Sequence, residues 1–86
     1  MLRITADTPQ DGIQRFRLDG RLTEDNVPEL ARALERSLRA VAQLTLDVSG
    51  LTYLDAGGAQ FLRALSAQKV TIRGSSSFVA KLLGLI

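Results

Sequence analysis

The sequence contains no cysteine, no histidine and no tryptophan among its 86 residues. Without cysteine, the chain can form no disulfide, offers no thiol nucleophile and supplies no thiolate ligand to a metal. Without histidine, it also lacks the usual acid–base catalyst and the commonest zinc and copper ligand, and it can form no Ser-His-Asp triad. We therefore expect a protein that is not an enzyme and that has no catalytic residue, metal site or cofactor.

Long apolar runs are absent as well. No apolar segment reaches the roughly 18 to 20 residues needed to cross a bilayer, and Met1 is followed by the strand-like segment LRITA rather than by a signal peptide. The formal net charge is only +2, and the arginines are dispersed instead of alternating with aromatic residues. The sequence thus predicts a cytoplasmic chain with no membrane insertion and no nucleic-acid partner.

The chain does contain enough apolar material for one small core. Its length suits a single domain. The hydrophobic fraction is 45%, but with three phenylalanines and one tyrosine the core must consist mainly of aliphatic side chains. We expect residues 1–86 to fold as one domain in which helices pack on a sheet.

Alternating apolar and polar residues predict four strands, at residues 2–6, 13–20, 44–48 and 70–73. The first two are joined by the turn-forming segment DTPQDG, which predicts a hairpin. Gly20 is expected to end the second strand, and Ser49 and Gly50 to break the third one before the apolar segment Leu51, Tyr53 and Leu54.

Three helices are predicted. The first is capped by Thr23 and continues with apolar residues at three- and four-residue spacing as far as Val41, the second begins at Ala56 and ends near Gln68 or Lys69, and the third begins after the serines at 75–77. Strands and helices alternate after the hairpin, which favours parallel pairing among the last three strands.

The predicted fold class is α/β, with a four-stranded mixed sheet and about three helices mainly on one face. Every predicted strand keeps a polar side, whereas parallel sheets covered on both faces are apolar on both. The polar residues are Arg3, Thr5, Arg15, Arg17, Thr45, Asp47, Thr71 and Arg73. We expect this face to be open to water or to a partner, and it or the apolar C-terminal end could support a homodimer.

The segment from Asp55 to Ala59, here called the corner, joins the third strand to the second helix. An aspartate before a helix can cap it. Gly57 and Gly58 follow in the first turn, where each costs up to about 1 kcal/mol relative to alanine. Either close helix–strand packing or room for a partner backbone would explain them. No lysine or hydroxyl residue follows in P-loop spacing, so we expect no nucleotide site.

Three motifs in this order resemble a STAS domain, the module of bacterial anti-sigma factor antagonists and of the cytoplasmic tails of sulfate transporters. They are the DGRL segment around residues 20–22, the Asp-x-Gly-Gly corner at residues 55–58, and the leucine-rich end at residues 78–85. The resemblance covers nearly the whole chain. It implies a single STAS-like domain acting as a non-catalytic protein-interaction module in signalling and transcription regulation.

The resemblance also implies a partner and a place where the partner docks. Family antagonists carry a phosphorylatable serine or threonine directly after the corner aspartate, but this chain has Ala56 there. It is therefore similar to an antagonist without the usual phosphoacceptor, with an anti-sigma factor kinase-like protein as partner. The alternative is the STAS accessory subunit that binds the ATPase of Mla-type phospholipid ABC transporters. The expected partner-docking residues are Asp55, Ala56, Gly57, Gly58 and Ala59.

Overall fold

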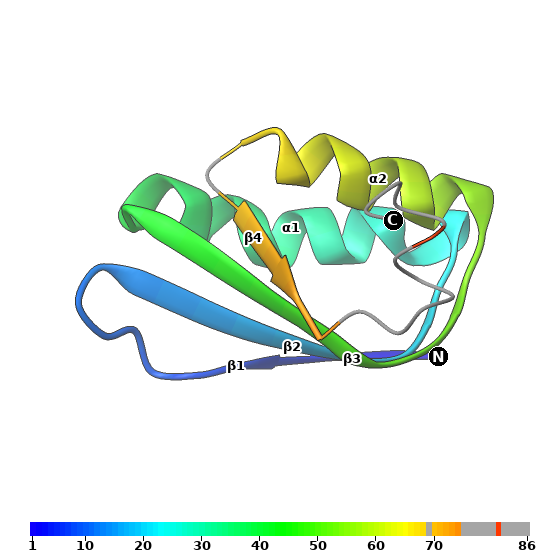
Figure 1. Cartoon of the computed structure of the whole chain (residues 1–86), viewed down its shortest axis with the longest axis horizontal. Helices are drawn as coiled ribbons and strands as arrows, with labels where there is room; N and C mark the ends of the chain where they lie inside the picture. The colour runs from blue at the N-terminus through cyan, green and yellow to red at the C-terminus, as the bar shows by residue number, and fades with distance from the viewer. Residues whose placement is uncertain (69, 75–80, 82–86) are drawn as a thin grey trace.

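A computed structural model describes residues 1–68, 70–74 and 81 of the chain (Figure 1). Strands and helices alternate after an initial pair of strands. Their bounds are β1 Leu2–Ala6, β2 Ile13–Leu22, the 3-10 helix η1 Glu24–Asn26, α1 Val27–Ala40, β3 Gln43–Leu54, α2 Ala56–Ser66 and β4 Val70–Arg73.

The four strands form one mixed sheet in the order β1-β2-β3-β4. Strand β1 pairs with β2 in antiparallel direction, with Ile4 opposite Leu18, whereas β2–β3 and β3–β4 are parallel. The hairpin and the parallel pairing predicted from the sequence are therefore confirmed.

Both described α-helices lie on the same face of the sheet (Figure 1). The apolar sides of all four strands face them, and the largest fully buried side chains are aliphatic: Leu18, Leu22, Leu30, Leu34, Leu44, Leu46, Leu62 and Val48. On the other face Arg73 is exposed and Asp47 is half-buried. Thr45 also belongs to this polar face but is only 8% exposed, since it lies on the central strand between Arg15 and Thr71. The predicted one-sided α/β arrangement is confirmed.

Two predicted strand ends are wrong. Strand β2 continues through Gly20 to Leu22, and β3 continues through Ser49 and Gly50 to Leu54. The register explains the second case, because Arg17 pairs with Asp47 but Asp19 pairs with Gly50, so β3 carries one extra residue in a bulge there. A side chain at position 50 would collide with the Asp19 carboxylate. Gly50 therefore lets the strand bulge rather than end.

The helices begin and end close to their predicted places, with two differences. Thr23 does precede a helical turn, but that turn is the 3-10 helix η1. The Thr23 N–H donates to the Asn26 Oδ1 at 2.8 Å. The α-helical part starts at Val27, with Pro28 in its first turn. Helix α2 ends at Ser66, before the predicted Gln68. Apart from Lys81, the predicted third helix lies outside the described residues and stays a prediction.

Within residues 1–68, 70–74 and 81, the helices are too short or too polar to span a bilayer.

Candidate protein-docking site

Asp55 fixes the corner through both oxygens of its carboxylate. The Gly58 N–H donates to Oδ1 at 2.7 Å, which caps α2 as the sequence predicts. The Glu24 N–H donates to Oδ2 at 2.9 Å, which ties the start of η1 to the same side chain. The Asp55 N–H in turn donates to the Leu22 carbonyl at 3.2 Å. One residue therefore joins the ends of β2 and β3 to the helical turns that follow them.

These bonds stabilise the charged form of the carboxyl group. The pKa of Asp55 lies below its ordinary value of 3.8, chiefly because of the Glu24 N–H and then the Gly58 N–H. Asp55 is thus an anion at neutral pH, placed at the positive end of the α2 dipole.

Close packing explains both corner glycines. A Cβ at Gly58 would lie 2.7 Å from the Leu22 carbonyl oxygen, and one at Gly57 would lie 2.8 Å from the Glu24 Cβ. The two positions therefore let the first turn of α2 approach the β2–η1 junction more closely than any other residue type would. Of the two explanations left open by the sequence, the structure supports helix–strand packing for Gly58, whereas Gly57 packs against η1.

The structure does not expose the whole corner. Ala56 is exposed, and Asp55 and Gly57 are half-buried, but Gly58 and Ala59 are buried. The last two of the five expected docking residues are therefore not at the surface, because they lie on the side of α2 that faces the core. At the surface, the corner presents Ala56 and the parts of its two half-buried neighbours.

Tyr53 and Arg21 form an exposed pair that the sequence analysis missed. The Arg21 guanidinium lies over the Tyr53 ring, 4.8 Å from its centre, and Tyr53 is 41% exposed. The sequence analysis grouped Tyr53 with Leu51 and Leu54 as one apolar segment. The sequence signal that was available is the residue type, because a tyrosine has an apolar ring and a polar tip and is often only partly buried.

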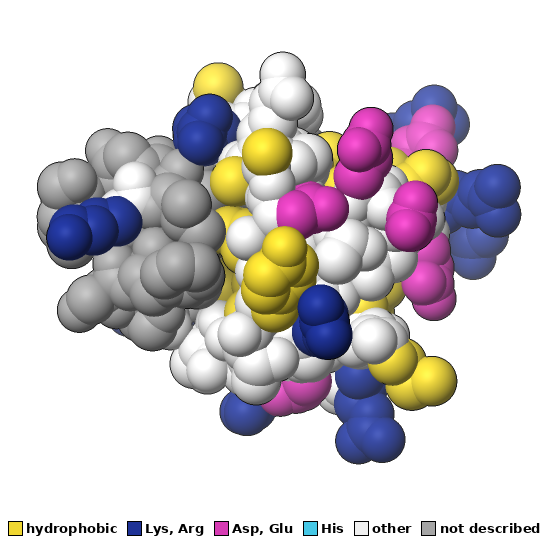
Figure 2. Space-filling model, turned by 90° about the vertical axis from the view of Figure 1, so that its right-hand side faces the viewer, with side chains coloured by type: hydrophobic (Ala, Val, Ile, Leu, Met, Phe, Trp, Pro, Cys, Tyr) yellow, Lys and Arg dark blue, Asp and Glu magenta, His cyan; other side chains and the backbone are white. Residues whose placement is uncertain are grey.

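Acidic side chains surround the same end of the molecule. Glu24 and Asp25 occupy the first turn of η1, Glu29 lies in the first turn of α1, and all three are exposed. Figure 2 views the end from which α2 starts and shows acidic side chains gathered beside hydrophobic ones. The surface is therefore small and acidic, with one exposed aromatic ring at its edge.

No metal site is evident in the part of the chain that the structure describes, where the acidic side chains form no group of three or more placed to hold an ion.

Comparison with known proteins places this geometry in context. The family model described as "Mlab, STAS domain" matches residues 7–86. A search of curated proteins gave no match.

Several solved structures are similar. An antisigma-factor antagonist STAS domain from Rhodobacter sphaeroides is 23% identical with a TM-score of 0.69, covering 85% of this chain and 86% of that one. The anti-sigma factor antagonist SpoIIAA in its unphosphorylated form is 14% identical with a TM-score of 0.73, covering 98% and 84%. An anti-sigma factor antagonist from Mycobacterium paratuberculosis is 20% identical with a TM-score of 0.76, covering 99% and 80%.

At these identities the three structures establish a shared fold. The family model goes further, because its match extends over all but the first residues of the sequence. The chain therefore belongs to the STAS-domain family.

Proposed function

We propose that this chain is a non-catalytic protein-docking module that binds a partner through the corner. The observation that carries the proposal is Ala56, a small exposed residue at the start of α2, held in place by the two Asp55 hydrogen bonds. A small side chain on a rigid turn lets a partner approach the backbone closely at little ordering cost. The exposed Tyr53 ring near the end of β3 is suited to anchor an interface, since tyrosines often contribute strongly to binding.

The proposed partner is an anti-sigma factor kinase-like protein. Three similar structures are anti-sigma factor antagonists, which supports this choice. Ala56 carries no hydroxyl and so cannot accept a phosphoryl group. We infer that docking at this position is not controlled by the addition of about −1.5 to −2 charges that a phosphate would bring.

A second candidate partner is the ATPase of an Mla-type phospholipid ABC transporter. The description of the matching family model favours it, and so does the Asp-x-Gly-Gly form of the corner. In this alternative the chain is an accessory subunit of the transporter. Both candidates use the same surface and differ in the protein that is bound.

The test compares Ala56→Glu with the wild type. Purified chain is titrated with the anti-sigma factor kinase and, separately, with the ABC ATPase from the same organism. Glutamate adds charge and bulk at the exposed start of α2, so we expect it to abolish binding to whichever protein the wild type binds. Acids are tolerated near a helix N-terminus, so the fold should remain intact, which thermal melting checks.

Ala64→Glu is the matched control. It makes the same change on the same helix, at an exposed position far from the corner. Retained binding in this variant together with loss in Ala56→Glu supports the proposal. Unchanged affinity in a folded Ala56→Glu protein would place the partner on another face and overturn it.

A further inference from the structure

The face of the sheet opposite the described helices carries an excess of arginine. Register places five arginines on it: Arg3, Arg15, Arg17, Arg21 and Arg73. All five are exposed, and they come from three different strands. Among the residues of the four strands, two aspartates, Asp19 and Asp47, share this face, so the strands carry a formal excess of three positive charges there. Asp7 and Asp11, between β1 and β2, border Arg15 at one end of the face.

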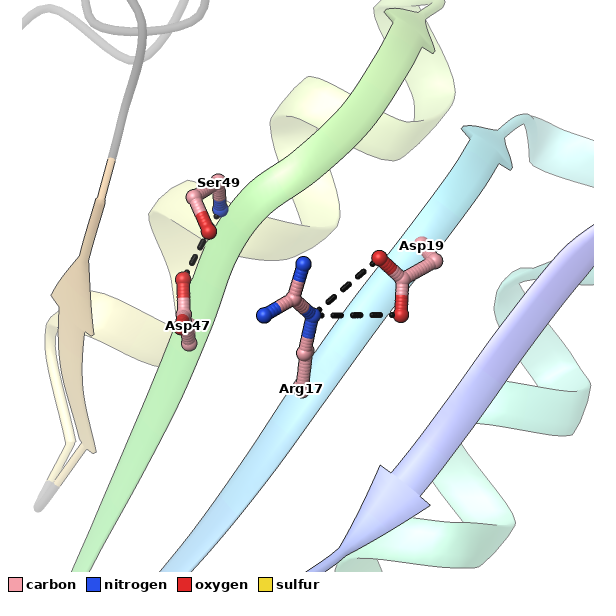
Figure 3. A network of polar contacts seen from close by, with 4 residues as sticks. All are labelled: Arg17, Asp19, Asp47 and Ser49. Carbon is pink, nitrogen blue, oxygen red and sulfur yellow. Dashed lines mark hydrogen bonds and ion pairs between the residues drawn. The ribbon is translucent and has the colours of Figure 1, made fainter.

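Both aspartates accept hydrogen bonds from neighbouring residues of the sheet (Figure 3). The Arg17 Nε donates to the two carboxylate oxygens of Asp19 at 3.2 and 3.3 Å. The Ser49 N–H donates to the Asp47 Oδ1 at 2.9 Å. Bonds from the Ser49 hydroxyl and amide, followed by the charges of Arg17 and Arg73, hold the pKa of Asp47 below its ordinary range. The two anions are thus fixed parts of the face.

Arg15 and Arg73 are both exposed. They line a shallow depression of about 280 Å³, together with Thr45, Asp47, Ser49 and Gly74. Among the ion pairs of the described residues, none involves either arginine. Guanidinium groups beside hydroxyl groups are well suited to carboxylates, because the planar fork of arginine can donate two parallel hydrogen bonds to one carboxylate.

We propose that this arginine face, defined by Arg3, Arg15, Arg17, Arg21 and Arg73, is a second docking surface, and that its occupant is an acidic protein segment. Charge complementarity argues for the acidic partner. Apart from Arg21, which stacks on Tyr53 at the edge of the corner surface, this face is distinct from the corner and would let one chain bind two protein segments at once.

The composition of the face argues for a polypeptide rather than a membrane or a nucleic acid. Tyr53 and Met1 are the exposed large hydrophobic side chains among the described residues, whereas stable attachment to a lipid surface needs a larger apolar insertion or a denser cluster of basic residues. Protein sheets that bind single-stranded nucleic acids stack the bases on several aromatic side chains.

The experiment measures binding of a labelled oligo-glutamate peptide to the purified chain at low and at physiological salt. The variant Arg15→Gln/Arg73→Gln removes two charges from the arginine face. Its matched control is Arg32→Gln/Arg36→Gln, which removes the same charge from exposed positions on α1. We expect about tenfold weaker binding for the first variant and little change for the control.

Each alternative outcome has a definite meaning. Equal losses in the two variants would show a general charge effect and would overturn the proposal, as would failure of the wild type to bind at low salt. Binding to phosphatidylglycerol vesicles but not to the peptide would assign the face to a membrane, which also overturns it. Circular dichroism confirms that both variants are folded.

Discussion

Asp55 accepts a hydrogen bond from the backbone of Glu24, a residue 31 positions earlier in the chain. The same carboxylate caps α2. The starts of η1 and α2 are therefore fixed to each other by one side chain at the edge of the sheet. A change at Asp55 should be felt by both helical turns and by the surface that they form.

Replacing Asp55 with alanine should lower the melting temperature, because two helix-terminal N–H groups lose their acceptor together. Asp55→Asn should have a smaller effect, since its single carbonyl oxygen still accepts from one of the two amides. Differential scanning calorimetry of both variants checks this order. Asp25→Ala, an exposed acid in the same region, serves as the control; a melting temperature for Asp55→Ala equal to that of the control would contradict the two-bond role.

Acid should destabilise the protein through the same residue. The pKa values of Asp55 and Asp47 are lowered in the folded state, so each carboxylate contributes stability above its unfolded value near 3.8. That contribution is lost as the pH falls below about 3.8 through the folded pKa. Urea unfolding between pH 7 and pH 3 should show stability declining at the acid end.

The matched comparison for pH is Asp55→Asn, which cannot titrate at this position. Its stability should fall less steeply than that of the wild type over the same acid range. Parallel curves for the two proteins would show that Asp55 makes no contribution to the pH dependence.

The sequence predicted the sheet, its polar face and the Asp55 cap, because each depends on residues close together in the chain. The alternation in Leu44, Leu46 and Val48 is one example. It did not predict that β3 passes through Gly50. That outcome depends on the Asp19 carboxylate of the neighbouring strand, which no local pattern reveals. The sequence also did not reveal the hydrogen bond from the Glu24 N–H to Asp55, because the two residues lie 31 positions apart in the chain.

Replacing Gly58 with alanine should destabilise the fold. The added methyl group would meet the Leu22 carbonyl oxygen and the Leu54 side chain, and overpacking of this kind costs about 1–3 kcal/mol. A gain in helix propensity of up to about 1 kcal/mol offsets part of this cost. We expect a lower urea midpoint, with exposed Gln60→Ala as the control on the same helix. A midpoint equal to or above that of the wild type would refute the close-packing explanation.

Incubation with an anti-sigma factor kinase should leave the corner unphosphorylated. An exposed serine and an exposed threonine precede the corner on β3, Ser49 and Thr52, and the Thr52 hydroxyl donates to the Gly20 carbonyl at 3.1 Å. Phosphopeptide mapping distinguishes the cases. Phosphate on either residue would show that the phosphorylation site lies on β3 instead of at position 56. The variant Ala56→Thr would show whether a hydroxyl group at position 56 is sufficient for phosphorylation.

The bond from the Arg21 N–H to the Met1 carbonyl, 3.1 Å long, holds the first residue at the same end of the molecule as the corner (Figure 1). A reporter or affinity tag fused before Met1 would therefore emerge beside the surface proposed to receive the partner. A bulky fusion there would obstruct binding on its own. An interaction screen that relies on such fusions would score a true partner as negative, whereas a cleavable tag removed before measurement would not.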